Sequence, residues 1–234
     1  MRKLGPVGGG ADTVIDALLE VLGPGGNLVL PTFSYARYAI DSCFDPSSTP
    51  CKTGILNEIG RQRKGTVRSL HPTHSITVIG PEAARLTEAH LEHRTFGIGS
   101  PLDRIAAGGG KVLLLGVPQT TSSMIHVAEE HAGVPKVSRF DPLPVVRVRG
   151  PDGKTADHQL DTSPSCSAGF EAAELPLRKN GEISDHRIGG ALCKLMLGSD
   201  IIQRVVETIR ETPAALRCTD PDCIPCSGTR KKLG

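Results

Sequence analysis

The chain has 234 residues, which is enough for one large domain or two small ones. Its 27 basic and 25 acidic residues nearly balance and aromatic residues make up only 3% of it, so the composition argues against a nucleic-acid partner. No stretch approaches the roughly 18 apolar residues of a membrane span, and the N-terminus lacks the apolar segment of a signal peptide. We therefore expect a cytoplasmic protein with no membrane partner, whose seven cysteines are reduced thiols.

Helical and strand patterns alternate along the chain. Apolar residues at helical spacing predict helices over residues 11–22, 54–62, 81–93, 102–107, 122–131 and 200–210. Short apolar or alternating runs predict strands over residues 27–31, 76–79, 111–117 and 145–149. No composition break between these segments is long enough for a linker, so we expect one α/β domain over residues 1–212 with a hairpin insertion at residues 143–160. We expect residues 213–234, rich in cysteine, proline and lysine, to form a tail outside the packed core.

The segment 68–75, RSLHPTHS, brings arginine, histidine and hydroxyl side chains together in a short stretch. Pro72 fixes its own backbone and disfavours a helix at His71, so the segment is predicted to be a loop. Such a loop can direct an arginine and hydroxyl groups at a phosphate or at a thioester carbonyl. The alternative is a polar loop in which His71 and His74 only hydrogen-bond the backbone, and composition alone favours this alternative.

Residues 120–131, TTSSMIHVAEEH, follow the clearest buried strand of the chain. Glu129 and Glu130 stand three and four positions after His126, so either carboxylate can share a helix face with the imidazole. A carboxylate orients a histidine and supports its protonated form, as general base catalysis requires. The hydroxyl groups of residues 121–123 lie where free helix N–H groups gather, which favours binding of an oxyanion or a phosphate. An N-capped amphipathic helix with an incidental ion pair explains the same residues equally well.

Cys218, Cys223 and Cys226 have the spacing C-x4-C-x2-C and could contribute ligands to a zinc ion. No histidine or cysteine follows them, so His186 or Cys193 would have to supply a fourth ligand. We therefore favour free thiols over a bound metal. A zinc module that binds a partner is the alternative.

Seven segments of the chain, taken in order, resemble the aminoglycoside 3-N-acetyltransferase family, whose fold is unrelated to that of the commoner GNAT acetyltransferases. They are GGGADTVIDALLEVLGPGGNLVLPTFS (8–34), FDPSSTP (44–50), RSLHPTHS (68–75), FGIGSPLDRI (96–105), GGKVLLLGV (109–117), SSMIHVAEE (122–130) and RIGGALCKLMLGSDIIQRVVETI (187–209). No single segment decides the resemblance, but their order and spacing make it specific to the family. The resemblance implies a single α/β domain with a central, mostly parallel or mixed sheet flanked by helices.

The resemblance also implies the reaction and the residues that perform it. Acetyl-CoA is the expected co-substrate, no metal is expected, and a small-molecule amine attacks the thioester directly. In the family pattern His126 is the general base and Glu129 is the acidic residue of the same helix. Tyr35 and Asp45 are expected near the acceptor, where an acidic group would attract a polycationic aminoglycoside. The residues expected to bind acetyl-CoA are Arg68, Ser69, His71, His74, Ser75, Thr121, Ser122 and Ser123.

Two departures from the family pattern define the alternatives. Family members carry an upstream helix and a strand ending in His-Ser-Ser-Leu just before the position of Met1, and we expect this chain to lack both. A sheet without that strand would have an unpaired edge, which favours a homodimer. Ile98 stands where relatives often have glutamate, which removes a charge that would favour an aminoglycoside. The alternatives are an acetyltransferase for a different amine of secondary metabolism and a truncated, non-catalytic protein that binds CoA.

Overall fold

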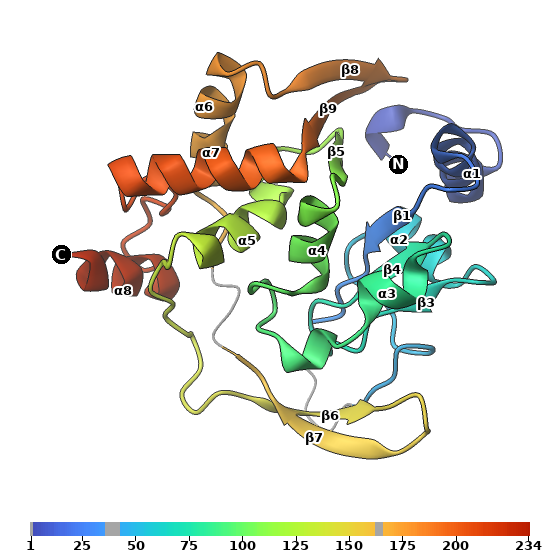
Figure 1. Cartoon of the computed structure of the whole chain (residues 1–234), viewed down its shortest axis with the longest axis horizontal. Coiled ribbons are helices and arrows are strands. Elements are labelled where there is room, and N and C mark those ends of the chain that lie inside the picture. The colour runs from blue at the N-terminus through green and yellow to red at the C-terminus, as the bar shows by residue number, and fades with distance from the viewer. Residues whose placement is uncertain (1, 36–42, 162–165) are drawn as a thin grey trace. The chain divides into compact units, whose positions relative to one another are not determined.

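The computed structural model describes residues 2–35, 43–161 and 166–234, and the chain divides into two compact units. Unit 1 comprises Met1–Thr95 and Leu143–Leu160, and unit 2 comprises Phe96–Pro142 and Asp161–Gly234. Helices and strands alternate in both units (Figure 1), which confirms the predicted α/β class. Among the described residues, no helix is both long enough and apolar enough to cross a bilayer.

Unit 1 is built on two small sheets. Its elements are the 3-10 helix η1 (Arg2–Leu4), helix α1 (Gly10–Leu22), strands β1 (Leu28–Pro31) and β2 (Cys43–Phe44), helix α2 (Ile55–Arg61), strands β3 (Val67–Arg68) and β4 (Ile76–Ile79), helix α3 (Ala83–Thr87), the 3-10 helix η3 (His90–Glu92), and strands β6 (Val145–Arg149) and β7 (Thr155–Gln159). The first sheet has the antiparallel order β1-β4-β3, and the second has the order β2-β6-β7. Gly60 of α2 lies directly over β1, because a Cβ atom there would strike Leu30. This close approach lets the helix cover the sheet.

The predicted helix over residues 81–93 is interrupted. Helix α3 ends at Thr87, Glu88 is extended, and Ala89 has the left-handed φ of 54°. A left-handed residue cannot continue a right-handed helix, so the chain turns into η3 instead. The turn places His90 in the interior of unit 1, where it is 3% exposed.

Unit 2 packs its helices around a third sheet. Its elements are helix α4 (Pro101–Ala107), strand β5 (Lys111–Leu115), the 3-10 helix η4 (Gln119–Thr121), helix α5 (Met124–His131), the 3-10 helix η5 (Phe170–Ala173), helix α6 (Glu174–Lys179), strands β8 (Ser184–Ile188) and β9 (Ala191–Leu197), and helices α7 (Gly198–Glu211) and α8 (Ile224–Leu233). Helix α5 packs against α7, whose buried face carries Ile201, Val205 and Ile209 at a spacing of one turn. Burial of each such side chain stabilises the fold by about 1.5–3 kcal/mol.

The described strands form three sheets of three strands each rather than one central sheet. Strand β2 runs parallel to β6, and the other described pairs are antiparallel. The hairpin predicted at residues 143–160 is confirmed as β6 and β7. A second hairpin joins β8 to β9. Such short connections impose antiparallel pairing, so the sheet β2-β6-β7 is mixed, as one of the two predicted arrangements, and the other two sheets are antiparallel.

The segment 213–234, predicted to lie outside the packed core, is packed within unit 2. Leu216, Cys226 and Thr229 are at most 1% exposed. The Thr229 hydroxyl donates a hydrogen bond of 3.0 Å to the carbonyl oxygen of Pro135. The segment ends in α8 (Figure 1), and its buried side chains contribute to the core of unit 2.

Candidate functional site

His126 of helix α5 is held by a carboxylate from its own helix. Its Nδ1 lies 2.8 Å from Oε2 of Glu129, and both side chains are buried. Because a carboxylate only accepts hydrogen bonds, Nδ1 carries the proton and Nε2 presents its lone pair. Nε2 has no hydrogen-bond partner among the described residues. The imidazole is therefore arranged to accept a proton at Nε2.

Two aromatic rings of unit 2 fix the plane of this imidazole. Phe96 stacks on it with 5.4 Å between ring centroids and an angle of 8°. Phe170 meets it edge to face at 4.6 Å and 66°. Neither contact was predicted from the sequence. Phe96 precedes a glycine-rich segment that was interpreted only as a turn, and no motif includes Phe170. The two phenylalanines limit rotation of the ring that Glu129 orients.

Two cations share the carboxylate of Glu129. Lys136 Nζ lies 3.2 Å from Oε2, and the Arg217 guanidinium contacts Oε1. Burial holds the pKa of His126 well below its usual value, and the charges of Lys136 and Arg217 lower it further, against the smaller opposing effect of Glu130. The imidazole is therefore neutral at pH 7. From the sequence we expected the carboxylate to favour the protonated form of His126, but these two cations offset its charge.

The three hydroxyl residues before α5 have different surroundings. Thr121 is exposed and donates a hydrogen bond of 2.8 Å to the carbonyl oxygen of Pro118. Ser123 is the residue before the helix, and its side chain makes no capping hydrogen bond. Ser122 is 2% exposed, and its Oγ has no hydrogen-bond partner within the described parts of the chain. A buried hydroxyl without a partner is destabilising by about 1–3 kcal/mol. Of these three residues, Ser122 would therefore be stabilised most by a hydrogen bond to a ligand.

In unit 1, His71 of the 68–75 loop organises the loop backbone. Its Nδ1 accepts hydrogen bonds from the N–H groups of Thr73 and His74, at 3.3 and 3.1 Å. Nε2 therefore carries the proton, and it lies 3.2 Å from Oγ1 of Thr95. Burial holds the pKa of His71 well below its usual value, and the neighbouring histidines add to this effect. These contacts match the alternative in which His71 has a structural role.

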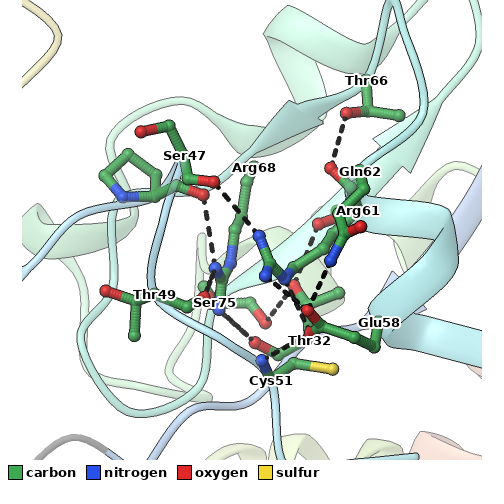
Figure 2. Close-up of polar contacts among 12 residues, drawn as sticks. Thr32, Ser47, Thr49, Cys51, Glu58, Arg61, Gln62, Thr66, Arg68 and Ser75 are labelled. Carbon is green, nitrogen blue, oxygen red and sulfur yellow. Dashed lines mark hydrogen bonds and ion pairs between the residues drawn. The ribbon is translucent and has the colours of Figure 1, made fainter. Parts of the chain in front are cut away.

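Arg68 connects several loops of unit 1 (Figure 2). Its Nε donates to Oγ of Ser75 at 2.9 Å, and Nη2 donates to the carbonyl oxygen of Thr32 at 2.7 Å. Nη1 donates to the carbonyl oxygens of Thr49 and Pro46, at 2.5 and 3.3 Å. Burial lowers the pKa of Arg68 to about 10, so it stays charged at pH 7. The protein itself therefore occupies most of the guanidinium donors, and the expected role of Arg68 in binding acetyl-CoA stays a prediction.

Ser69 and Ser75 are also committed to the protein. Ser69 Oγ lies 2.8 Å from Nδ1 of His90 and accepts a 2.9 Å hydrogen bond from the N–H of Ile76. Ser75 Oγ donates to the carbonyl oxygen of Thr32 at 2.9 Å. Both serines are buried. They fix the loop to strand β4 and to the end of β1, and their expected contact with acetyl-CoA stays a prediction.

The structure brings together two residues to which the sequence assigned different roles. The ring of Tyr35, predicted near the acceptor, lies 5.2 Å from that of His74. Phe33 completes the cluster, with centroid distances of 6.1 Å to Tyr35 and 4.7 Å to His74. Tyr35 has the left-handed φ of 51°, an uncommon conformation for a residue other than glycine. Such conformations concentrate at functional sites, so Tyr35 and His74 stay candidates for substrate contact.

Asp45 is engaged by two neighbours in unit 1. Its Oδ1 accepts hydrogen bonds from the backbone N–H and the hydroxyl of Ser47, at 2.8 and 2.5 Å. Its Oδ2 lies 3.2 Å from Nε of Arg149. The hydrogen bond from the Ser47 hydroxyl is the main reason that the pKa of Asp45 lies below its usual value. Asp45 therefore stabilises a turn and balances an arginine, and its predicted place near a cationic acceptor stays a prediction.

Comparison with known proteins defines the class to which this fold belongs. A family model of aminoglycoside 3-N-acetyltransferases matches residues 1–210. Aminoglycoside N(3)-acetyltransferase III from Salmonella sp is 32% identical, over 86% of this chain and 80% of the relative. Aminoglycoside N(3)-acetyltransferase VII from Streptomyces paromomycinus is also 32% identical, over 90% of this chain and 83% of the relative.

Solved structures give the same result. The apoenzyme of the aminoglycoside acetyltransferase AAC(3)-IVa matches with a TM-score of 0.83 and 26% identity, over 98% of this chain and 86% of that chain. A complex of AAC-IIIb with CoASH matches with a TM-score of 0.76 and 26% identity, over 90% of this chain and 87% of that chain. By fold and sequence the protein is an acyltransferase, which confirms the predicted class of enzyme. It belongs to the aminoglycoside 3-N-acetyltransferase family, as the resemblance in the sequence indicated.

Proposed function

We propose that this protein transfers the acetyl group of acetyl-CoA to the 3-amino group of an aminoglycoside antibiotic, with His126 as the general base. The observation that carries the proposal is a buried imidazole with Nδ1 fixed on Glu129 and with Nε2 unbonded among the described residues. Two solved relatives support the choice of substrates. One is a complex with CoASH, and another, a variant of AAC(3)-IVa with a TM-score of 0.84, is a complex with a gentamicin.

In the proposed reaction, the neutral amine of the acceptor attacks the carbonyl carbon of the thioester. The amine proton passes to Nε2 of His126 as the new carbon–nitrogen bond forms. The carbon–sulfur bond of the tetrahedral intermediate then breaks, and His126 returns the proton to the departing CoA sulfur. The products are an acetamide and CoA thiol, and no other reactant is needed. The lowered pKa of His126 keeps its lone pair available at pH 7.

The other groups in unit 2 have supporting roles in this proposal. Glu129 stabilises the imidazolium that exists while His126 holds the proton. Among the residues predicted to bind acetyl-CoA, we assign a specific role to Ser122, because its buried hydroxyl has no partner in the described residues. We assign that hydroxyl to the oxygen of the thioester carbonyl, which becomes negatively charged in the intermediate.

A thiol-release assay with acetyl-CoA and a panel of aminoglycosides tests the proposal. We expect CoA release, and an acetylated 3-amino group in the product. His126→Gln should lower kcat by about 10²–10⁴-fold while calorimetry shows unchanged CoA binding. His131→Gln on the same helix is the matched control, because His131 pairs with Asp103 at 2.7 Å and its side chain is 33% exposed.

Three results would contradict the proposal in different ways. Normal turnover in His126→Gln would refute the assignment of the base. CoA release with other amines only would support the alternative acceptor of secondary metabolism. No turnover with any amine, with acetyl-CoA still bound, would support the non-catalytic alternative.

A further inference from the structure

Four cysteine sulfur atoms converge in unit 2. The Sγ atoms of Cys166, Cys218, Cys223 and Cys226 all lie within 4.8 Å of one another. Cys166 precedes η5, Cys218 lies between α7 and α8, and the other two stand at the start of α8. Three of the four are buried and Cys166 is partly buried. The proposed acetyl transfer uses none of them.

We propose that these four cysteines bind one structural zinc ion. A tetrahedral zinc–thiolate site has bonds of about 2.3 Å, which places its sulfur atoms roughly 3.8 Å apart. Four sulfur atoms that are mutually within 4.8 Å meet this requirement with small side-chain adjustments. From the sequence we favoured free thiols, with a zinc module as the alternative, because no fourth ligand follows Cys226. The structure supplies that ligand from upstream, as Cys166, and neither His186 nor Cys193 belongs to the cluster.

The position of two of these cysteines relative to helix α8 also suits a zinc site. Cys223 directly precedes α8, and Cys226 lies in its first turn. The x2 spacing of Cys223 and Cys226 at a helix start is typical of zinc ligands.

The charges around the cluster also fit a zinc site. Four thiolates and one divalent ion carry a net charge of −2, which needs nearby cations. Arg217 directly precedes Cys218 and is buried, with 6% of its surface exposed. Arg230 of α8 donates a 2.6 Å hydrogen bond from Nη1 to the carbonyl oxygen of Cys218. Soft thiolate ligands select zinc over hard divalent cations.

The zinc site would also hold Arg217 in place. Arg217 directly precedes Cys218, and its guanidinium contacts Oε1 of Glu129. Glu129 in turn holds Nδ1 of His126 at 2.8 Å. Zinc binding at Cys218 therefore restrains a cation that pairs with the carboxylate that orients the proposed base.

The second cation on Glu129 depends on the same segment. Lys136 lies in a stretch covered by α8, where Thr229 donates a hydrogen bond to the carbonyl oxygen of Pro135 at 3.0 Å. Gly228 packs so closely on Val137 that a Cβ atom at position 228 would lie 2.8 Å from it. The zinc site would thus restrain the segments that carry both cations of Glu129, Arg217 and Lys136. Zinc binding itself does not depend on the proposed function, although its effect on turnover does.

Metal analysis of the full-length chain, purified without a histidine tag or added metal, tests the site. We expect about one zinc per chain by mass spectrometry, because structural zinc is held tightly. Cys166→Ser and Cys226→Ser should both fall below about 0.1 zinc per chain. Cys193→Ser is the matched control, since Cys193 is a buried thiol of β9 outside the cluster, and this variant should keep its zinc.

Two results would overturn the site. The first is a wild-type protein with less than about 0.1 zinc per chain, whether its cysteines are free or paired in disulfides. The second is full zinc content in Cys166→Ser, which would refute the fourth ligand. Iron in place of zinc would refute the identity of the metal.

Hydrogen exchange on the wild-type protein tests the structural role without relying on variants that fail to fold. Removal of zinc with a chelator should speed exchange by about tenfold or more in residues 135–137 and 213–234 and leave β4 of unit 1 unchanged. Addition of zinc should restore protection. Unchanged exchange after complete metal removal would refute the structural role. If the protein binds zinc but acetylates no aminoglycoside, the proposed function is refuted and the zinc site is not.

Discussion

Oε2 of Glu129 lies 2.8 Å from Nδ1 of His126, and the same oxygen lies 3.2 Å from Nζ of Lys136. The carboxylate thus has two roles, since it orients the imidazole and balances buried positive charge. Removal of its charge should therefore affect both turnover and stability.

We expect Glu129→Gln to lower kcat by about 10²-fold, because the imidazolium loses its counter-charge. The free energy of unfolding should fall by about 3–5 kcal/mol, since the buried cations Lys136 and Arg217 lose the charge of this carboxylate. Steady-state kinetics and urea denaturation measure the two effects. Glu130→Gln is the matched control, because Glu130 lies further from Lys136, at 3.7 Å. Equal kcat values for Glu129→Gln and the wild type would contradict the orienting role.

Arg68→Ala should lower the free energy of unfolding by about 3 kcal/mol, because buried acceptors on Thr32, Thr49 and Ser75 lose a charged donor. Arg63→Ala provides the comparison. Arg63 pairs with carboxylates whose side chains are at least 60% exposed, so its loss should change stability by less than about 1 kcal/mol. The KM for acetyl-CoA should not change in either variant. A stable Arg68→Ala protein with a raised KM for acetyl-CoA would instead support the predicted role of Arg68 in acetyl-CoA binding.

The stability of the protein should fall as the pH decreases below about 6.5, the ordinary pKa of histidine. The pKa values of His71 and His126 are both held well below that value in the folded state, mainly by burial. Below pH 6.5 the unfolded chain binds protons that the folded chain does not. Each histidine should then reduce the free energy of unfolding by about 1.4 kcal/mol per pH unit, until its folded pKa is reached.

Urea denaturation between pH 8 and pH 5.5 measures this slope. Above about pH 6.5 these two histidines should contribute no pH dependence. His71→Asn should remove about half of the slope that these two histidines cause, because one of the two lowered pKa values is gone. An unchanged free energy of unfolding between pH 6.5 and pH 5.5 would show that both imidazoles become protonated without unfolding.

Asp45→Asn should leave the KM for aminoglycosides unchanged, since Arg149 and Ser47 already occupy the Asp45 carboxylate. Asp157→Asn is the matched control, because Asp157 pairs with an arginine of the same hairpin, Arg147, at 3.1 Å. Kinetic assays over a range of aminoglycoside concentrations compare the two variants. A large rise in the KM for aminoglycosides in Asp45→Asn alone would support the prediction that Asp45 lies near the acceptor.

Features set by local periodicity could be predicted from the sequence. The strand β5 and the helices α5 and α7 lie close to their predicted positions, because apolar spacing along each segment is regular. The contact between His126 and Glu129 follows from the same logic, since residues three apart on a helix are neighbours. The family was also identified from ordered motifs, which the family model confirms.

Features that depend on distant parts of the chain could not be predicted in this way. Lys136 and Arg217 reach Glu129 only through tertiary packing, and no spacing rule places Cys166 beside Cys223. The break in the predicted helix over residues 81–93 depends on the left-handed backbone of Ala89, for which the sequence carries no glycine signal. The roles of polar side chains were hardest to assign, because composition does not say which acceptors surround an arginine such as Arg68.

The alternation of the chain between the two units has a consequence for the order of folding during synthesis. Strand β2 pairs with β6 in the register of Cys43 with Arg147, so unit 1 cannot complete its second sheet until the later hairpin has left the ribosome. By then the chain over Phe96–Pro142 has already emerged. Its strand β5 is still unpaired at that point, because β9 has not yet been synthesised. Such long-range pairings slow folding and prolong the exposure of unpaired strands. Unit 1 can therefore complete its sheets once Leu160 has emerged, whereas the sheet of unit 2 must wait for β8 and β9.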